Sequence, residues 1–244
     1  MKTIEQVPEY IRLLIPYEPG KPIEEVEREY GISNSVKLAS NENPLGPSPK
    51  ALAAIRAKMD QLHLYPDGDC FYLKNGLAKK LGVAPEQLIF GNGSNEIIEL
   101  AVRTFMRAGD EAVMAQQAFV VYQLIVQGVG GKSLQVPLRD FTHDLSAMAD
   151  AVSPQTRIVF LANPNNPTGT IFRRDDWEKF LANVSKDVLL IVDEAYFEYV
   201  QESNYPNSLD YHAEGRAILT LRTFSKLYGL AGLRVGYGVA AKEL

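Results

Sequence analysis

VLLIVDEAY, residues 188–196, places five apolar residues directly before the carboxylates of Asp193 and Glu194. An uninterrupted apolar run between helical segments predicts a strand buried on both faces, which is typical of a parallel sheet covered by helices. Asp193 ends this run, and a carboxylate is costly to bury unless it meets a cation. Its partner is therefore either a nearby Arg or Lys or a protonated group on a ligand.

Strands and helices alternate on both sides of this stretch. The pattern predicts strands at 88–90, 111–115, 132–138, 157–162, 188–192, 217–221 and 233–239, and helices at 22–30, 50–59, 70–81, 95–108, 119–128, 144–152 and 174–184. This alternation indicates an α/β fold with a mostly parallel sheet flanked by helices. Prolines break residues 1–47 into short pieces, so we expect an N-terminal arm there and one large domain over 48–244.

The segments that directly follow the predicted strands are polar. They are 91–95, 163–169, 193–196 and 223–226. In a parallel sheet, ligands bind beyond the carboxyl ends of the strands, so these segments are expected to meet around one site. The glycines of 91–95 precede a helix and suit a phosphate, although a tight turn with a helix cap is the more common reason for such glycines.

Lys226 is the candidate nucleophile of this group. A lysine amine becomes nucleophilic when burial or a neighbouring positive charge lowers its pKa, and Arg234 supplies such a charge and a forked anion clamp. The alternative is an ordinary surface lysine, which is the common case for any single Lys.

Composition argues against several other functions. A net charge of −5 disfavours nucleic acid and anionic membranes as partners, and no apolar stretch approaches the length of a membrane helix. The N-terminal residues have no apolar signal core, so export is not expected. A lone Cys70 and three scattered histidines predict neither a disulfide nor a metal site.

Several ordered motifs resemble the fold-type-I aminotransferases that depend on pyridoxal 5'-phosphate (PLP). They are NPNNPTG at 163–169, DEAY at 193–196 and TFSKLYGLAGLRVGY at 223–237. Within that family, LASNENPLGPSP at 38–49, YPDG at 65–68 and GNGSNEIIE at 91–99 are similar to the histidinol-phosphate aminotransferase branch. The resemblance covers essentially the whole chain.

The resemblance implies a role for each matching residue on the ring side of the cofactor. Lys226 would hold PLP covalently and carry the transferred proton, while Asp193 would pair with the pyridine nitrogen and keep it protonated. Tyr196 and Asn166 would bind the phenolic oxygen of the ring, and Phe119 would stack on it.

Other positions follow from the same resemblance. Arg234, Thr223, Ser225 and the backbone around Ser94 and Asn95 would hold the phosphate. Tyr65 would reach the cofactor phosphate of a partner subunit, which implies a homodimer, and Tyr17 and Asn41 would lie over the substrate.

The implied reaction is transfer of an amino group between histidinol phosphate and 2-oxoglutarate in histidine biosynthesis, in the cytoplasm. Two alternatives stay open. One is a PLP-dependent decarboxylase that acts on a phosphorylated amino acid such as threonine phosphate. The other is a non-catalytic fragment that only binds PLP.

The family pattern also continues beyond the position of Leu244. In relatives, that later part builds most of a small domain, to which the arm also contributes, and supplies an arginine for the substrate carboxylate. Neither Arg12 nor Arg28 matches that arginine by motif. We therefore expect a C-terminally truncated chain with most of the small domain missing, impaired or absent transaminase activity and exposed apolar surface.

Overall fold

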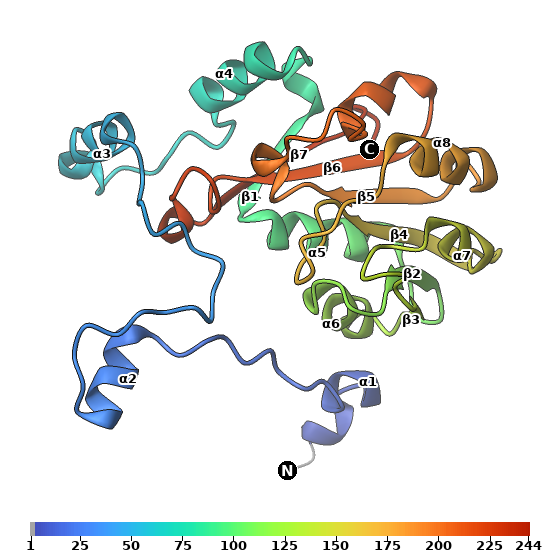
Figure 1. Cartoon of the computed structure of the whole chain (residues 1–244), viewed down its shortest axis with the longest axis horizontal. Coiled ribbons are helices and arrows are strands. Elements are labelled where there is room, and N and C mark those ends of the chain that lie inside the picture. Colours follow the sequence, from blue (N-terminus) through green and yellow to red (C-terminus); the bar gives the residue numbers. More distant parts are fainter. Residues whose placement is uncertain (1–2) are drawn as a thin grey trace.

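A computed structural model describes residues 3–244 and is built around one seven-stranded sheet (Figure 1). Met1 and Lys2 of the predicted arm lie outside the described residues. The strands are β1 (Leu88–Asn92), β2 (Glu111–Ala115), β3 (Lys132–Val136), β4 (Thr156–Ala162), β5 (Leu189–Asp193), β6 (Ile218–Thr223) and β7 (Val235–Val239), in the order β1-β7-β6-β5-β4-β2-β3.

The sheet is mostly parallel, as the apolar runs predicted. Within residues 3–244, β7 alone runs antiparallel to its neighbours, β1 and β6. The remaining neighbouring pairs are parallel. The α/β fold class predicted from the sequence is confirmed.

The helices of the described residues are α1 (Glu9–Arg12), α2 (Ile23–Tyr30), α3 (Pro49–Arg56), α4 (Phe71–Leu81), α5 (Ser94–Phe105), α6 (Val121–Gly128), α7 (Leu145–Asp150) and α8 (Arg174–Asn183). α5 and α6 cover one face of the sheet, and α7 and α8 cover the other. The helix predicted over 95–108 was too long: α5 ends at Phe105 because Met106 takes an extended conformation and is buried in the core. The helix predicted over 50–59 was also too long, since α3 ends at Arg56.

Successive side chains of β4 point to opposite faces of the sheet, and both faces are buried, so its sequence is continuously apolar. Ile158 and Phe160 pack with α5 and α6 on one face of the sheet. Val159 and Leu161 pack on the other face with α7 and α8, where Trp177 stacks between Phe172 and Phe180. Both faces of the strand are thus removed from water, and the large apolar side chains of the two clusters stabilise the sheet.

A buried ion pair joins Glu194, the residue directly after β5, to Arg222 within β6. The Arg222 guanidinium donates to Glu194 Oε2 from Nη2 at 2.7 Å and from Nε at 2.9 Å. Asn207 Oδ1 accepts a further bond from Arg222, and the guanidinium lies 3.6 Å from the centre of the Phe197 ring. Glu194 Oε1 accepts the backbone N–H of Ser208, so both ions are also hydrogen-bonded.

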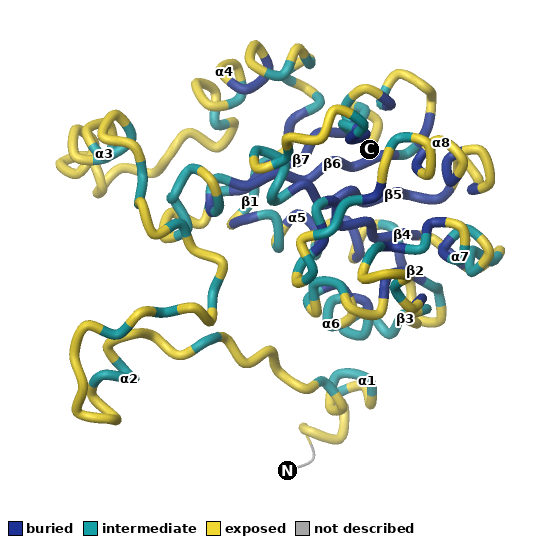
Figure 2. Tube along the Cα trace, viewed as in Figure 1, coloured by how far each residue is buried: buried dark blue, intermediate teal, exposed yellow. Residues whose placement is uncertain are grey.

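The region before α3 packs far less closely than the sheet. Its backbone is largely exposed (Figure 2) and no strand occurs in its described residues, 3–47. α1 contacts α6, where Gln127 Nε2 donates to the carbonyl of Tyr10 at 3.1 Å. Apolar side chains in this region, between α3 and α4 and on α4 are exposed, among them Leu38, Leu45, Leu62, Phe71 and Tyr72.

Among residues 3–244, no helix combines the length and apolar character needed to span a membrane. The same part of the chain brings no three His, Cys, Asp or Glu side chains together as a metal site.

Candidate active site

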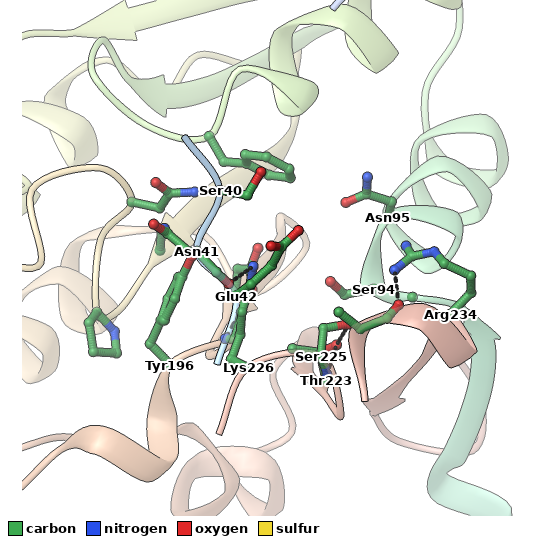
Figure 3. Close-up of a pocket in the computed structure, with 18 of the residues that line it drawn as sticks. Ser40, Asn41, Glu42, Ser94, Asn95, Tyr196, Thr223, Ser225, Lys226 and Arg234 are labelled. Carbon is green, nitrogen blue, oxygen red and sulfur yellow. Dashed lines mark hydrogen bonds between the residues drawn. The ribbon is translucent and has the colours of Figure 1, made fainter. Parts of the chain in front are cut away.

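A cavity of about 230 Å³ lies at the carboxyl ends of β4, β5 and β6 (Figure 3). Segments far apart in the sequence meet there, as the strand order predicts for the edge of a parallel sheet. Most of the sequence-predicted site residues line this cavity: Asn41, Ser94, Asn95, Phe119, Asn166, Asp193, Tyr196, Thr223, Ser225, Lys226 and Arg234.

Asp193 is the buried acid of the cavity. Its Oδ2 accepts a hydrogen bond from the Tyr122 hydroxyl at 2.7 Å, and its Oδ1 accepts the backbone N–H of Ala195 at 3.1 Å. Burial raises the pKa of Asp193, while these two hydrogen bonds oppose that rise. No ion pair to Asp193 occurs within residues 3–244, although the amine of Lys226 also lowers the pKa of Asp193 through its charge. The carboxylate is therefore left to meet a cationic group from a ligand.

Tyr122 is a site residue that the sequence reasoning missed. It lies on α6 with 1% of its surface exposed, stacks on Phe160 at 4.7 Å between ring centres and meets the Phe119 ring edge-on. Its helix was predicted, but no sequence pattern pairs it with Asp193, which lies 71 positions away. The three rings fix the hydroxyl that orients the carboxylate.

We expect Tyr122→Phe to weaken PLP binding by about tenfold, because a hydrogen bond to a charged group is lost. Loss of that bond also raises the pKa of Asp193 further, so binding weakens first at acidic pH. Absorbance titration with PLP at several pH values measures both effects. Tyr211→Phe is the matched control, since its partly buried hydroxyl also donates to a carboxylate, Glu178, outside the cavity. Equal affinities for wild type and Tyr122→Phe would contradict this role.

Lys226 is half-buried, and its amine points into the cavity (Figure 3). Nζ donates to the carbonyl of Asn41 at 3.1 Å and lies 5.5 Å from the centre of the Tyr196 ring. Burial lowers the pKa of Lys226, and Arg234 adds to this effect, while Asp193 and Glu42 oppose it. The lowered pKa increases the fraction of neutral, nucleophilic amine.

The opposite end of the cavity is suited to an anion. Arg234 donates from Nη1 to the Ala231 carbonyl at 3.0 Å, and Figure 3 shows it beside Ser94 and Asn95 at the start of α5. Gly93 has φ +76°, and a side chain there would put its Cβ 2.7 Å from Arg234 Nη2. A guanidinium and free N–H groups at a helix N-terminus together form a phosphate site.

Two hydroxyl groups complete this end. The Thr223 hydroxyl donates to the Ser225 hydroxyl at 3.0 Å, and Thr223 Oγ1 accepts the backbone N–H of Ser225 at 3.1 Å. These bonds hold both side chains at the cavity wall.

The asparagine-proline loop forms another wall. Asn163 is buried and bonds the backbone of Phe172, so it fixes the loop itself. Asn166 lines the cavity. Tyr196 accepts a hydrogen bond from the Asn41 amide at 2.8 Å, which brings the arm to the same wall.

His143 supports this loop from behind. Its Nε2 lies 3.1 Å from Asn165 Oδ1, and Asn165 uses its amide nitrogen to donate to the Gln117 carbonyl and to Thr168. The amide oxygen is thus an acceptor, so His143 Nε2 carries the proton. Burial lowers the pKa of His143 to about 4, although the bond with Asn165 opposes this shift.

This shift predicts a loss of stability in acid. The folded pKa of His143 lies below the unfolded value of about 6.5, so the unfolded chain binds more protons between these values. The stabilisation is complete above about pH 6.5 and falls by about 2 kcal/mol by pH 5. Urea unfolding at pH 8 and pH 5 measures the change. His143→Gln should show about 2 kcal/mol less pH dependence than wild type, and identical pH dependence would contradict the assignment.

Two predicted residues lie away from the cavity. Tyr65 is fully exposed, and Tyr17 is 54% exposed in the arm; neither lines the cavity. Conversely, Ser40 and Glu42 line it without having been predicted. Glu42 follows Asn41 and belongs to the LASNENPLGPSP motif, which is the signal that could have identified it.

The residues present fit PLP. The cavity combines an anion end, a buried carboxylate, an aromatic ring at Phe119 and an amine of lowered pKa. These groups match, in turn, a phosphate, a protonated ring nitrogen, a flat aromatic ring and an aldehyde.

Comparison with known proteins places this site in a family context. Residues 33–244 match the family model "Aminotransferase class I and II". The histidinol-phosphate aminotransferase of Moorella thermoacetica is 54% identical over 99% of this chain, and histidinol-phosphate aminotransferase 2 of Nitrosospira multiformis is 50% identical over all of it. The chain spans 63% of the length of each of these relatives.

A solved structure is similar over the same region. The Sinorhizobium meliloti histidinol-phosphate aminotransferase, crystallised in complex with PLP, superposes with a TM-score of 0.88 at 30% identity. The superposition covers 98% of this chain and 64% of that structure.

Proposed function

We propose that this chain, which belongs to the class I and II aminotransferase family, forms the PLP-binding part of a histidinol-phosphate aminotransferase. The proposed reaction transfers an amino group between histidinol phosphate and 2-oxoglutarate. The observation that carries the proposal is the placement of Lys226, Asp193 and Arg234 around one cavity, because each has a chemical partner in a different part of PLP.

PLP, when bound, supplies an electron sink that stabilises negative charge at the substrate Cα. Asp193 supports this by keeping the ring nitrogen protonated, since a buried carboxylate strongly favours a cation beside it. Tyr196 and Asn166 offer a hydroxyl and an amide to the phenolic oxygen of the ring.

Lys226 has two successive tasks in the proposed reaction. Its amine first holds the cofactor, and burial favours the neutral form that this requires. With PLP and substrate bound, the freed amine of Lys226 would be the base that removes the proton at the substrate Cα. Arg234, Thr223 and Ser225 hold the phosphate throughout, so the ring stays in register with the amine.

A homodimer is part of this proposal. Tyr65, Phe71 and Tyr72 expose aromatic rings around α4, and Leu62 does the same beside them. An exposed apolar group of this kind is typical of an interface, and a second copy of the chain is the partner that the Tyr65 motif favours. We also propose residues 1–47 as the arm, residues 48–244 as the large domain, and the cytoplasm as the location.

The relatives named above are aminotransferases, which favours amino transfer over the decarboxylation considered from the sequence. Incubation of the chain with PLP, borohydride reduction and peptide mass mapping tests the cofactor assignment. We expect a phosphopyridoxyl adduct confined to the Lys226 peptide, and no adduct on a folded sample would refute it. Release of carbon dioxide from threonine phosphate, without amino transfer from histidinol phosphate, would refute the substrate assignment.

A further inference from the structure

The arm segment 41–47 lies across the loop that carries Lys226 and contacts it at three points. Lys226 Nζ donates to the carbonyl of Asn41 at 3.1 Å, and Asn43 Nδ2 donates to the carbonyl of Leu227 at 2.7 Å. At the third point the two backbones touch: a side chain on Gly229 would put its Cβ 2.6 Å from the carbonyl carbon of Gly46. Figure 3 shows the arm passing beside Lys226 at Asn41 and Glu42.

Asn43 is held so that its amide nitrogen can face the loop. Its Oδ1 accepts the backbone N–H of Leu45 at 3.0 Å, and its carbonyl accepts the N–H of Gly46 at 3.1 Å. The side chain thus closes an Asx turn with its oxygen and leaves its nitrogen for Leu227. Asn43 and Leu227 are 184 positions apart, so this bond ties two distant parts of the chain together.

The loop itself is closed by two backbone bonds of its own. Gly229 N donates to the Lys226 carbonyl at 3.0 Å, and Leu230 N donates to the Phe224 carbonyl at 3.1 Å. These bonds fix its shape but do not attach it to the arm. The attachment comes from the Asn43 amide and from the contact between Gly229 and Gly46.

We propose that Asn43 is a positioning residue for Lys226, and that its amide clamps the Lys226 loop to the arm so that the amine stays inside the cavity. The inference rests on the proposed role of Lys226 as the cofactor-binding lysine. Asn43 does not line the cavity and acts only through the loop.

Loss of the clamp should change the chemistry of the amine. The charged and polar groups that face Lys226 are Asp193, Glu42 and Arg234, with the Tyr196 ring and the Asn41 carbonyl. Burial lowers the pKa of Lys226 in the clamped position. A released loop moves the amine toward water, so its pKa rises toward that of an ordinary lysine and its neutral fraction falls.

Acetylation of the chain without PLP tests this directly. The chain is treated with limiting acetic anhydride across a pH series, and the acetylated fraction of the Lys226 peptide is measured by mass spectrometry. For Asn43→Ala we expect the midpoint of Lys226 labelling to rise by about half a pH unit or more. We also expect PLP to bind about tenfold more weakly in an absorbance titration.

Two further variants make the test specific. Asn43→Ser keeps a hydroxyl that can accept the Leu45 N–H but is too short to reach Leu227, so it should behave like Asn43→Ala and guards against misfolding of the first variant. Asn183→Ala is the matched control, because it removes an amide bond of 2.7 Å to the Lys179 carbonyl on α8, outside the cavity. This control should leave both measurements unchanged.

The outcomes separate the two proposals. The clamp is refuted if Asn43→Ala and Asn43→Ser keep the wild-type midpoint, or if Asn183→Ala shifts it equally. Because acetylation needs no cofactor, it still tests the clamp if wild type forms no PLP adduct, a result that would refute the proposed function instead.

Discussion

Lys226→Ala is expected to abolish the borohydride-stable PLP adduct and to leave PLP bound only reversibly. The amine is the only group at the cavity, among residues 3–244, that can both bond the cofactor and carry the Cα proton. Its removal leaves the phosphate and ring contacts in place, so PLP should still bind, but reversibly. Mass mapping after reduction and an absorbance titration measure the two effects separately.

Lys186→Ala is the matched control for this experiment. Its Nζ donates to the carbonyl of Glu214 at 3.1 Å, just as Lys226 donates to Asn41, but it lies outside the cavity. The control should retain the full adduct on the Lys226 peptide. An adduct of wild-type yield in Lys226→Ala would show that another lysine holds the cofactor.

Arg222→Met is expected to lower the free energy of unfolding by about 3–5 kcal/mol. Glu194 is completely buried and Arg222 is 4% exposed, so loss of the guanidinium leaves a negative charge in the core without its counter-ion. The contact with the Phe197 ring is lost as well. The free energy of unfolding of a typical domain is only about 5–15 kcal/mol, so this loss would be a large share of the total. Urea unfolding at neutral pH measures the loss.

A second substitution tests the reason for that loss. Arg222→Met combined with Glu194→Gln removes the buried charge while keeping an oxygen for the backbone N–H of Ser208. If the unpaired charge causes the instability, the double variant should be more stable than Arg222→Met alone. Equal stability of the two variants would instead assign the loss to packing around Phe197.

The sequence was sufficient to predict which segments meet at the cavity. Polar residues that follow the carboxyl ends of parallel strands lie at the same end of the sheet. The sequence alone therefore predicts that the segments at Asp193, Asn163 and Thr223 share one site, and all three line the cavity. The same argument reached Lys226 and the turn at Gly93. The resemblance to a known family then supplied roles that periodicity alone does not give.

Other features depend on pairings that periodicity cannot reveal. The apolar pattern marks Tyr122 as one residue of a helix face, and only the packing of α6 on the sheet brings its hydroxyl to Asp193. The sequence likewise left a nearby Arg or Lys open as the partner of Asp193, whereas in the structure Arg222, on the neighbouring strand β6, pairs with Glu194. Asn43 lies in the recognised arm motif, but it bonds the backbone carbonyl of Leu227. Every residue has such a carbonyl, so the sequence does not show which one Asn43 contacts.

The reversed direction of β7 has a consequence for how the cavity is assembled. Since β6 and β7 are antiparallel neighbours, the chain leaves the sheet at Thr223 and re-enters it beside the same edge at Arg234. A parallel connection would have carried the chain to the opposite edge. Lys226, Thr223, Ser225 and Arg234 therefore belong to one short hairpin, whose closure costs little conformational entropy. This part of the cavity is built from residues that are close in the sequence. It can therefore form before Asp193 and the arm pack against it.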